Sequence, residues 1–324
     1  MAGGLILAGL AALGRRAPAV LVIGVVLGLL LPGVGAPLRP LLPSLVVMVF
    51  GLALVRIRWS AVAAGLRRPW WIGGVVVMLM AAVPATVHAA AVALRLPADV
   101  AAALVMMACA PPIASAPTLA LLLGIDAAAA LTIVVAATLA MPLIAPPLLF
   151  VLIGLDLGVA PLAVALRLAA TIALGVAVAA GLRWLLGSAR IDRHGRVLDG
   201  ASAVVLVLFV IAVMTGVQAR LIADPATVLA LLAAACAVNF GLQALFGLPA
   251  AVVADASGST RRRLLAVALM AGNRNVALFL AALPEPAAEL LTVFVALYQV
   301  PIYATPLLAG PLYRRLGRGE PALR

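Results

Sequence analysis

The chain has 324 residues, of which 67% are hydrophobic and only 10% are charged, and its formal net charge is +12. Soluble domains carry about 45–50% apolar and about 25% charged residues, so this composition excludes a water-soluble globular protein. At about 20 residues per span, the length predicts an all-α polytopic membrane protein of about ten transmembrane helices. All the basic residues are arginine and most border apolar runs, which indicates a membrane-topology signal and no nucleic-acid partner.

Ten apolar runs follow one another along the chain, and prolines or glycines mark many of the joints. The runs do not alternate apolar and polar residues, as the strands of a transmembrane β-barrel would. Near the start, the apolar residues 5–13 precede Arg15 and Arg16, the reverse of the order in a signal peptide, so we expect no cleaved signal. The predicted spans are residues 17–35, 37–55, 70–94, 98–124, 127–153, 160–186, 200–219, 226–254, 262–283 and 288–312.

The arginines are distributed unevenly between the two sets of loops that these spans define. With the N-terminus placed inside, seventeen arginines fall on the inner side, and only Arg39, Arg95 and Arg220 fall on the outer side. The positive-inside rule therefore predicts that both termini are cytoplasmic. We expect a multi-pass protein of a bacterial inner membrane. A missed span would reverse the side of every later loop, so the asymmetry also favours ten spans.

Prolines interrupt the fourth run, "CAPPIASAPTLALLLGID" (109–126), at Pro111, Pro112 and Pro117. Proline removes a backbone donor and clashes with the preceding turn, so a regular helix is not expected to pass through this segment. In lipid, the freed backbone groups need partners from the protein or from a water-filled cavity. The sequence therefore predicts a discontinuous helix, with Ser115 and Thr118 close to the break.

The ninth run is interrupted by "AGNRN" (271–275). Gly272, Asn273 and Asn275 are poor helix formers. Arg274 lies between the two asparagines, too far along the run to reach either membrane surface easily. A charged residue at a helix centre costs about 2.5–3.5 kcal/mol on insertion scales, which makes it a candidate functional residue.

The two interruptions occupy the fourth span of each set of five. Because five is odd, the second set must run inverted relative to the first. Paired interruptions in inverted repeats are typical of a secondary-transporter binding site at the bilayer midplane. We predict one membrane domain over 1–324, with repeats at 17–153 and 160–313 and with the fourth and ninth helices crossing. The predicted substrate site is Arg274, Asn273, Asn275, Ser115 and Thr118, and the crossover backbone is Pro111, Pro112, Pro117 and Gly272.

Three roles remain open for Arg274. It could pair with an anionic substrate, because guanidinium suits carboxylate and phosphate. It could replace a bound sodium ion and hold the two crossovers together through backbone carbonyls near Pro111 and Ala114. It could instead cap freed carbonyls without any role in transport. The ten acidic residues all lie in or near predicted loops, so an external anion is a natural counter-charge.

Other polar residues in the spans are candidates for lining a cavity. His88 in the third span could shuttle protons or simply pack through a hydrogen bond. Asn239 and Gln243, four residues apart, share one face of the eighth span and either line the cavity or link helices. The remaining candidates are Thr138 in the fifth span and Tyr298 and Gln299 in the tenth.

Three stretches resemble the bile acid:sodium symporter superfamily, which includes bacterial organic-anion transporters and arsenite efflux carriers. They are "CAPPIASAPTLALLLGID" (109–126), "TIVVAATLAMPLIAPPLL" (132–149) and "ALMAGNRNVALFLAA" (268–282). The resemblance implies a core domain of spans 3–5 and 8–10 and a panel domain of spans 1, 2, 6 and 7. It also implies that substrate binds between the two domains.

The chain departs from this family where sodium would bind. The ninth-span carboxylate of sodium-using members corresponds to Met270, and a family glutamine corresponds to Arg274. The serine–asparagine ligand pair of the fourth span becomes Ala116–Pro117, and Thr138 alone keeps a ligand-like side chain. Sodium, like other hard cations, prefers anionic or carbonyl oxygen. These departures predict that the sodium sites are dismantled, and we expect no metal or other cofactor.

The sequence thus predicts a secondary transporter that moves a small organic anion by alternating access and is not an enzyme. The expected partners are the anion and the lipid bilayer, and the oligomeric state stays open. Three alternatives remain: a sodium-coupled bile-acid-like symporter, a channel, and an arsenite-type efflux carrier. Cys109, just before the first crossover proline, would be the reactive thiol in the last of these.

Overall fold

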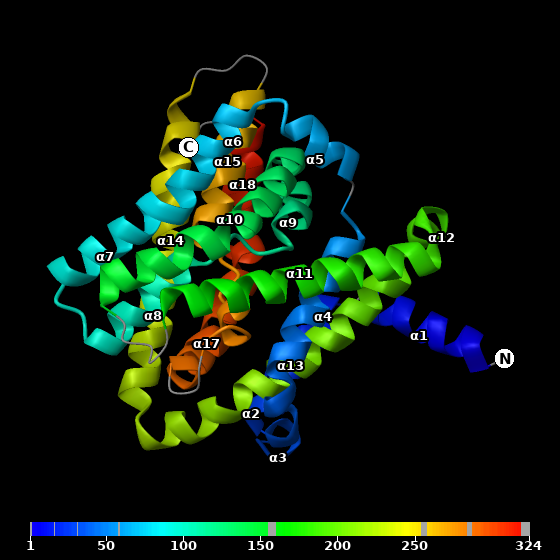
Figure 1. Ribbon diagram of the computed structural model, residues 1–324, viewed down its shortest axis with the longest axis horizontal. Coiled ribbons are helices and arrows are strands. Elements are labelled where there is room, and N and C mark those ends of the chain that lie inside the picture. The colour runs from blue at the N-terminus through cyan, green and yellow to red at the C-terminus, as the bar shows by residue number, and fades with distance from the viewer. Residues whose placement is uncertain are drawn as a thin grey trace. The chain divides into compact units, whose positions relative to one another are not determined.

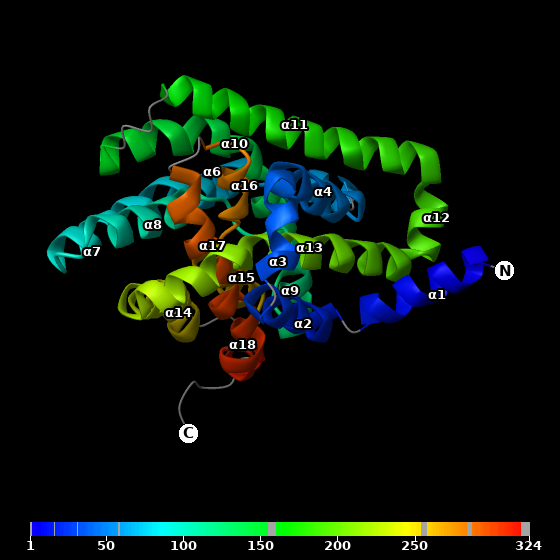
Figure 2. The same ribbon diagram turned by 90° about the horizontal axis from the view of Figure 1, so that it is seen from below.

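The structure is a computed structural model that describes residues 2–15, 17–30, 32–57, 59–154, 160–253, 258–283 and 287–318. Helices account for all the regular elements within these ranges (Figures 1 and 2), which confirms the all-α prediction. Seven helices of the described ranges are long and apolar enough to cross a membrane. They are Gly33–Val55, Pro69–Ala93, Ala127–Ile153, Pro161–Leu186, Gly195–Ala223, Pro225–Val252 and Leu291–Leu308.

The predicted fourth and ninth runs each form two shorter helices. Helix α8 (Ala98–Cys109) ends before the paired prolines, and α9 (Ala116–Leu123) begins after them. Helix α15 (Ser259–Gly272) ends at the Gly-Asn-Arg-Asn sequence, and α16 (Ala277–Leu280) follows it. The first predicted run forms α2 (Ala17–Leu30), which is too short to span a membrane alone, and the single turn α3 (Pro32–Gly35), which leads into the span Gly33–Val55.

The chain forms two compact units. The first unit contains Met1–Ile57, Arg167–Leu229 and Ala277–Ala296, and the second contains Arg58–Leu166, Ala230–Val276 and Leu297–Arg324. The chain passes from one unit to the other within α11 (Pro161–Leu186), α14 (Pro225–Val252) and α17 (Ala287–Leu308).

Helix α13 (Gly195–Ala223) is the centre of the first unit. Helices α1 (Ala2–Arg15), α2 and α4 (Leu42–Val55) pack along it (Figure 2). Close approach depends on glycine, because a Cβ at Gly200 would overlap the carbonyl oxygen of Leu10 in α1. Arg183 of α11 caps the end of α4 by donating from Nη1 to the carbonyls of Val55 at 2.7 Å and Ile57 at 3.2 Å.

Alanine at Gly200 is expected to lower the free energy of unfolding by about 1–3 kcal/mol, since a methyl group must displace the backbone of α1. Gly216 of the same helix is the matched control, because a Cβ there meets nothing within 4 Å. Gly216→Ala should instead stabilise the helix by about 0.5–1 kcal/mol. Thermal unfolding in detergent measures both variants, and equal melting temperatures would contradict the packing of α1 on α13.

Helix α10 (Ala127–Ile153) is the centre of the second unit and contacts α8, α9, α15, α5 (Trp59–Gly65) and α6 (Pro69–Val77) (Figure 1). Between α6 and α7 (Val83–Ala93) lies a π-helical turn, Met78–Ala82. This wider turn ends two residues before Pro84, which lacks an N–H and whose ring would clash with an earlier carbonyl in a regular helix. The remaining elements are the 3₁₀ helix Ala36–Leu41, α12 (Ser188–Arg193) and α18 (Gly310–Gly317).

Candidate functional site

The two interrupted segments meet in the second unit as a short antiparallel β-bridge between Pro112 and Arg274. The amide of Ile113 donates to the carbonyl of Asn273 at 3.0 Å, and the amide of Asn275 donates to the carbonyl of Pro111 at 2.7 Å. Backbone groups freed by the helix breaks therefore satisfy each other across the crossing. This pairing removes the cost of burying them unpaired.

Local sequence explains why the chain is extended at this point. The residue before a proline avoids the helical region, and Ala110, just before Pro111, is extended at φ −71° and ψ 149°. Asn273 is extended at φ −100° and ψ 99°. Gly272 lies against α14, where a Cβ would overlap the carbonyl oxygen of Asn239. A residue without a side chain is thus needed where α15 approaches α14.

The guanidinium of Arg274 lies at this crossing and is buried, with only 1% of the residue exposed. Its Nε donates to the carbonyl of Ala271 at 2.9 Å, and its Nη1 donates to the carbonyl of Ala110 at 3.1 Å. These carbonyls belong to the C-terminal ends of α15 and α8. Helix C-termini carry partial negative charge. The one guanidinium therefore stabilises the C-terminal ends of two half-helices from different parts of the chain.

No carboxylate among the described residues pairs with Arg274. The ion pairs in the described part of the chain join Arg56 to Asp199 and Arg263 to Asp126. The Nη2 atom of Arg274 is buried and has no hydrogen-bond partner among the described residues. Within those residues, no group of three or more His, Cys, Asp or Glu side chains could hold a metal ion. Within the described part of the chain, backbone carbonyls are therefore the groups that compensate this buried charge.

A network of hydroxyl and amide groups surrounds the ninth-run side of the crossing. Asn239 of α14 donates from Nδ2 to the carbonyl of Gly272 at 2.7 Å and to the hydroxyl of Tyr298 at 3.3 Å. Gln243, one turn further along α14, donates from Nε2 to Oδ1 of Asn239 at 2.6 Å and to Oγ1 of Thr305 at 3.2 Å. Asn239 and Gln243 therefore link α14 to the crossing and to α17.

The network also includes two residues that the sequence did not single out. Thr305 donates to Oδ1 of Asn273 at 3.3 Å and to the carbonyl of Pro301, and Tyr313 of α18 donates to Oε1 of Gln243 at 3.1 Å. Tyr298 and Thr305 are seven residues apart in an apolar helix and share one face. That spacing is the signal that could have identified Thr305.

The other predicted site residues occupy different environments. Pro111, Pro112 and Gly272 are buried at the crossing, whereas Ser115 and Thr118 are exposed at the start of α9. Asn273 is fully buried, and its amide donates to the carbonyl of Leu269 at 2.8 Å. Thr138 is buried on α10; half-buried residues are Pro117, Asn275, His88 and Gln299.

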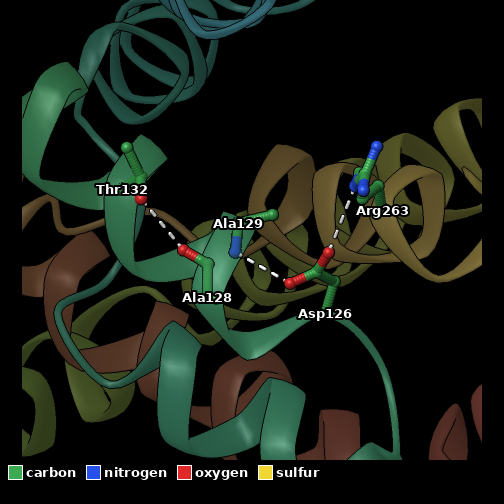
Figure 3. A network of polar contacts seen from close by, with 5 residues as sticks. All are labelled: Asp126, Ala128, Ala129, Thr132 and Arg263. Carbon is green, nitrogen blue, oxygen red and sulfur yellow. Dashed lines mark hydrogen bonds and ion pairs between the residues drawn. The ribbon is translucent and has the colours of Figure 1, made fainter. Parts of the chain in front are cut away.

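A second link joins the segments of the fourth and ninth runs at the other end of α15 (Figure 3). Asp126 accepts from the amide of Ala129 at 2.9 Å, which caps the start of α10, and from Nε of Arg263 at 3.4 Å. The amide of Asp126 donates to the carbonyl of Arg262 at 3.3 Å. Helix α15 is thus tied to the α9–α10 segment at its beginning and to the end of α8 at its end.

The profile of the Sodium Bile acid symporter family matches residues 42–225, which is more than half of the chain. The chain therefore belongs to this family of membrane transporters. The matched residues include the crossover at 110–115, whereas Arg274 lies beyond them. A search among curated proteins found no significant match.

Proposed function

We propose that the protein is a secondary transporter that moves a small organic anion by alternating access and uses Arg274 in place of a bound sodium ion. The observation that carries this proposal is the guanidinium itself. It is buried, it has no carboxylate partner in the described residues, and it donates to carbonyls from both interrupted segments.

A sodium ion and the guanidinium of Arg274 would both need the same backbone carbonyl oxygens at the crossing. A cation at the crossing needs oxygen ligands, and the carbonyls of Ala110 and Ala271 already accept from the guanidinium. A second positive charge beside a buried guanidinium would be repelled strongly at low dielectric. Met270 is fully buried where the family resemblance implies a carboxylate. These features favour transport that does not depend on sodium.

Arg274 also gives the crossing its preference for an anion. Its Nη2 retains two N–H donors without a partner among the described residues, and guanidinium binds carboxylate and phosphate well. Ser115 and Thr118 are exposed, and Asn275 is half-buried beside Arg274, so their polar groups are the accessible ones for a ligand. We assign these three residues to substrate contact and Arg274 to the fixed charge.

The architecture we propose for this function has inverted repeats at 17–153 and 160–313. The second compact unit would be the core, because it contains predicted spans 3–5 and 8, the ninth run up to its break, and the end of span 10. The first unit would be the panel, because it contains spans 1, 2 and 7 and most of span 6, although it also contains Ala277–Ala296 from spans 9 and 10. We place both termini in the cytoplasm of a bacterium, on the strength of the arginine distribution.

Counterflow in proteoliposomes tests the function. Vesicles loaded with an unlabelled organic anion should accumulate the labelled anion from outside, and equally well in sodium chloride and choline chloride. A channel or a sensor would show no such accumulation. Arg274→Gln should reduce the initial rate about tenfold or more, because hydrogen bonds to charged groups contribute about 1.5–3 kcal/mol and about 1.4 kcal/mol corresponds to a tenfold change.

Two results would contradict the proposal. Counterflow that occurs only in sodium would indicate the sodium-coupled symporter. Unchanged counterflow by Arg274→Gln, at equal protein level, would remove Arg274 from the mechanism. Arg263→Gln is the matched control, since Arg263 lies on α15, the helix that ends just before Arg274, and is partly exposed. The rate of this variant should stay within about twofold of the wild-type rate.

A further inference from the structure

The hydroxyl of Tyr298 lies at the point where α15 ends. It donates to the carbonyl of Gly272, and it accepts from the backbone amide of Arg274 at 3.2 Å and from Nδ2 of Asn239. Tyr298 itself is only 1% exposed. One side chain of α17 thus bonds to backbone groups on both sides of Asn273, where α15 ends and the chain becomes extended.

These bonds fix the backbone at Arg274 and therefore the direction in which its side chain points. The amide of Asn273 bonds to its own helix at Leu269, while its carbonyl bonds to Ile113 across the crossing. The next amide, that of Arg274, bonds to Tyr298. Since the guanidinium must reach Ala110 on another segment, a small rotation of the backbone at Arg274 would move Nη1 out of hydrogen-bond distance.

We propose that Tyr298 is a positioning residue: its hydroxyl holds the backbone at Gly272 and Arg274 so that the guanidinium clamps the end of α8. The proposal rests on the proposed function of Arg274 as the fixed cation of the crossing. Tyr298 acts through Arg274 and does not itself contact substrate. Removing its hydroxyl should release the clamp without removing the charge.

The reactivity of the Cys109 thiol measures whether the guanidinium of Arg274 still holds the end of α8. Cys109 is fully buried and is the last residue of α8, next to Ala110, whose carbonyl accepts from Arg274. Cys236 on α14 is partly exposed and is replaced by serine in every variant tested. The rate at which methyl methanethiosulfonate modifies Cys109 in detergent-solubilised protein is then measured. This rate needs no substrate, so it is independent of whether the transport assay succeeds.

Tyr298→Phe should increase the modification rate of Cys109 about tenfold or more, because the amide of Arg274 and the carbonyl of Gly272 each lose a buried partner. Arg274→Gln should give a comparable increase. The double variant should react no faster than Arg274→Gln alone, since both changes remove the same clamp. A role in general packing would instead give additive effects, and this separates positioning from simple stabilisation.

Tyr313→Phe is the matched control. Tyr313 is also a buried tyrosine of the network, but its hydroxyl donates to Gln243 and not to the crossing backbone. In Tyr313→Phe, the modification rate of Cys109 should stay within about twofold of the rate in the Cys236→Ser parent. An unchanged rate in Tyr298→Phe, additive effects in the double variant, or an equal increase in Tyr313→Phe would overturn the proposal.

Hydrogen exchange provides a test that needs no Tyr298 variant. The amide of Arg274 lies in a non-helical segment, yet its bond to Tyr298 predicts exchange about a hundredfold or more slower than that of an open loop. Overlapping peptides that cover 269–276 give this rate in the wild-type protein. Exchange as fast as in an open loop would overturn the proposal even if Tyr298→Phe failed to fold.

Discussion

Arg274→Gln is expected to lower the free energy of unfolding by about 2–4 kcal/mol. The carbonyls of Ala110 and Ala271 would each lose a charged donor, and hydrogen bonds to charged groups contribute about 1.5–3 kcal/mol. The C-terminal ends of α8 and α15 would also lose a neighbouring cation. Glutamine carries no charge, so the variant avoids the cost of burying one, which is about 2.5–3.5 kcal/mol on insertion scales. This gain offsets part of the loss.

Arg263→Gln and Arg274→Lys are the controls for this loss. Arg263 lies on α15, which ends just before Arg274, but it pairs with Asp126 at 3.4 Å and 30% of its side chain is exposed, so its loss should cost at most about 1 kcal/mol. Lysine at 274 keeps the charge but lacks the planar fork that reaches two carbonyls, and it should fall between wild type and glutamine. Melting temperatures in one detergent give the ranking. Equal losses at 274 and 263 would contradict the buried clamp.

Gly272→Ala is expected to destabilise the protein by about 1–3 kcal/mol or more, because its methyl group would enter the backbone of α14. The added Cβ would overlap the carbonyl oxygen of Asn239 and lie 2.7 Å from Cγ of Gln243. The side chain of Gln243 has some freedom to move, but the helix backbone has little. The bond from Asn239 to the carbonyl of Gly272 would lengthen as the helices separate. Both thermal stability and counterflow should fall.

Gly247→Ala tests the same helix interface without the clash. Gly247 lies on α14, and a Cβ there would meet the Cβ of Ala268 in α15 at 3.8 Å, an ordinary contact. Alanine at 247 should therefore be neutral or stabilise by about 0.5–1 kcal/mol through helix propensity. If Gly272→Ala is as stable as Gly247→Ala, α15 does not approach α14 as closely as described.

The helix breaks were predictable because they depend on local chemistry. Pro111 and Pro112 each remove a backbone donor and disfavour a helix, although α10 continues through Pro146 and Pro147, so proline alone does not decide the break. Gly272 and Asn273 weaken one, and α8 and α15 end at these positions. Helix lengths after the breaks were less predictable. Helix α9 has 8 residues and ends at Gly124, which adopts a left-handed φ of 72°, whereas α16 has only 4 residues, too few to be stable on local sequence alone.

The partners of Arg274 were only partly predictable from the sequence. Its burial and its lack of an acidic partner follow from the arrangement of charges along the chain, and a bond to carbonyls near Pro111 was one expected role. The backbone bridge between Pro112 and Arg274 depends on two segments more than 150 residues apart, so no local pattern indicates it. The sequence predicts that Tyr298 lines a cavity or links helices, but a hydroxyl in an apolar helix does not reveal which backbone group it meets.

The most direct test of the central claim, that Arg274 replaces sodium, is the melting temperature of the wild-type protein during titration with sodium chloride and, separately, with choline chloride. A ligand that binds the folded state raises stability by an amount that grows with its concentration. We expect the two curves to coincide, because the guanidinium already holds the carbonyls of Ala110 and Ala271. A sodium-specific, saturable rise would show that the protein binds sodium and would contradict the claim.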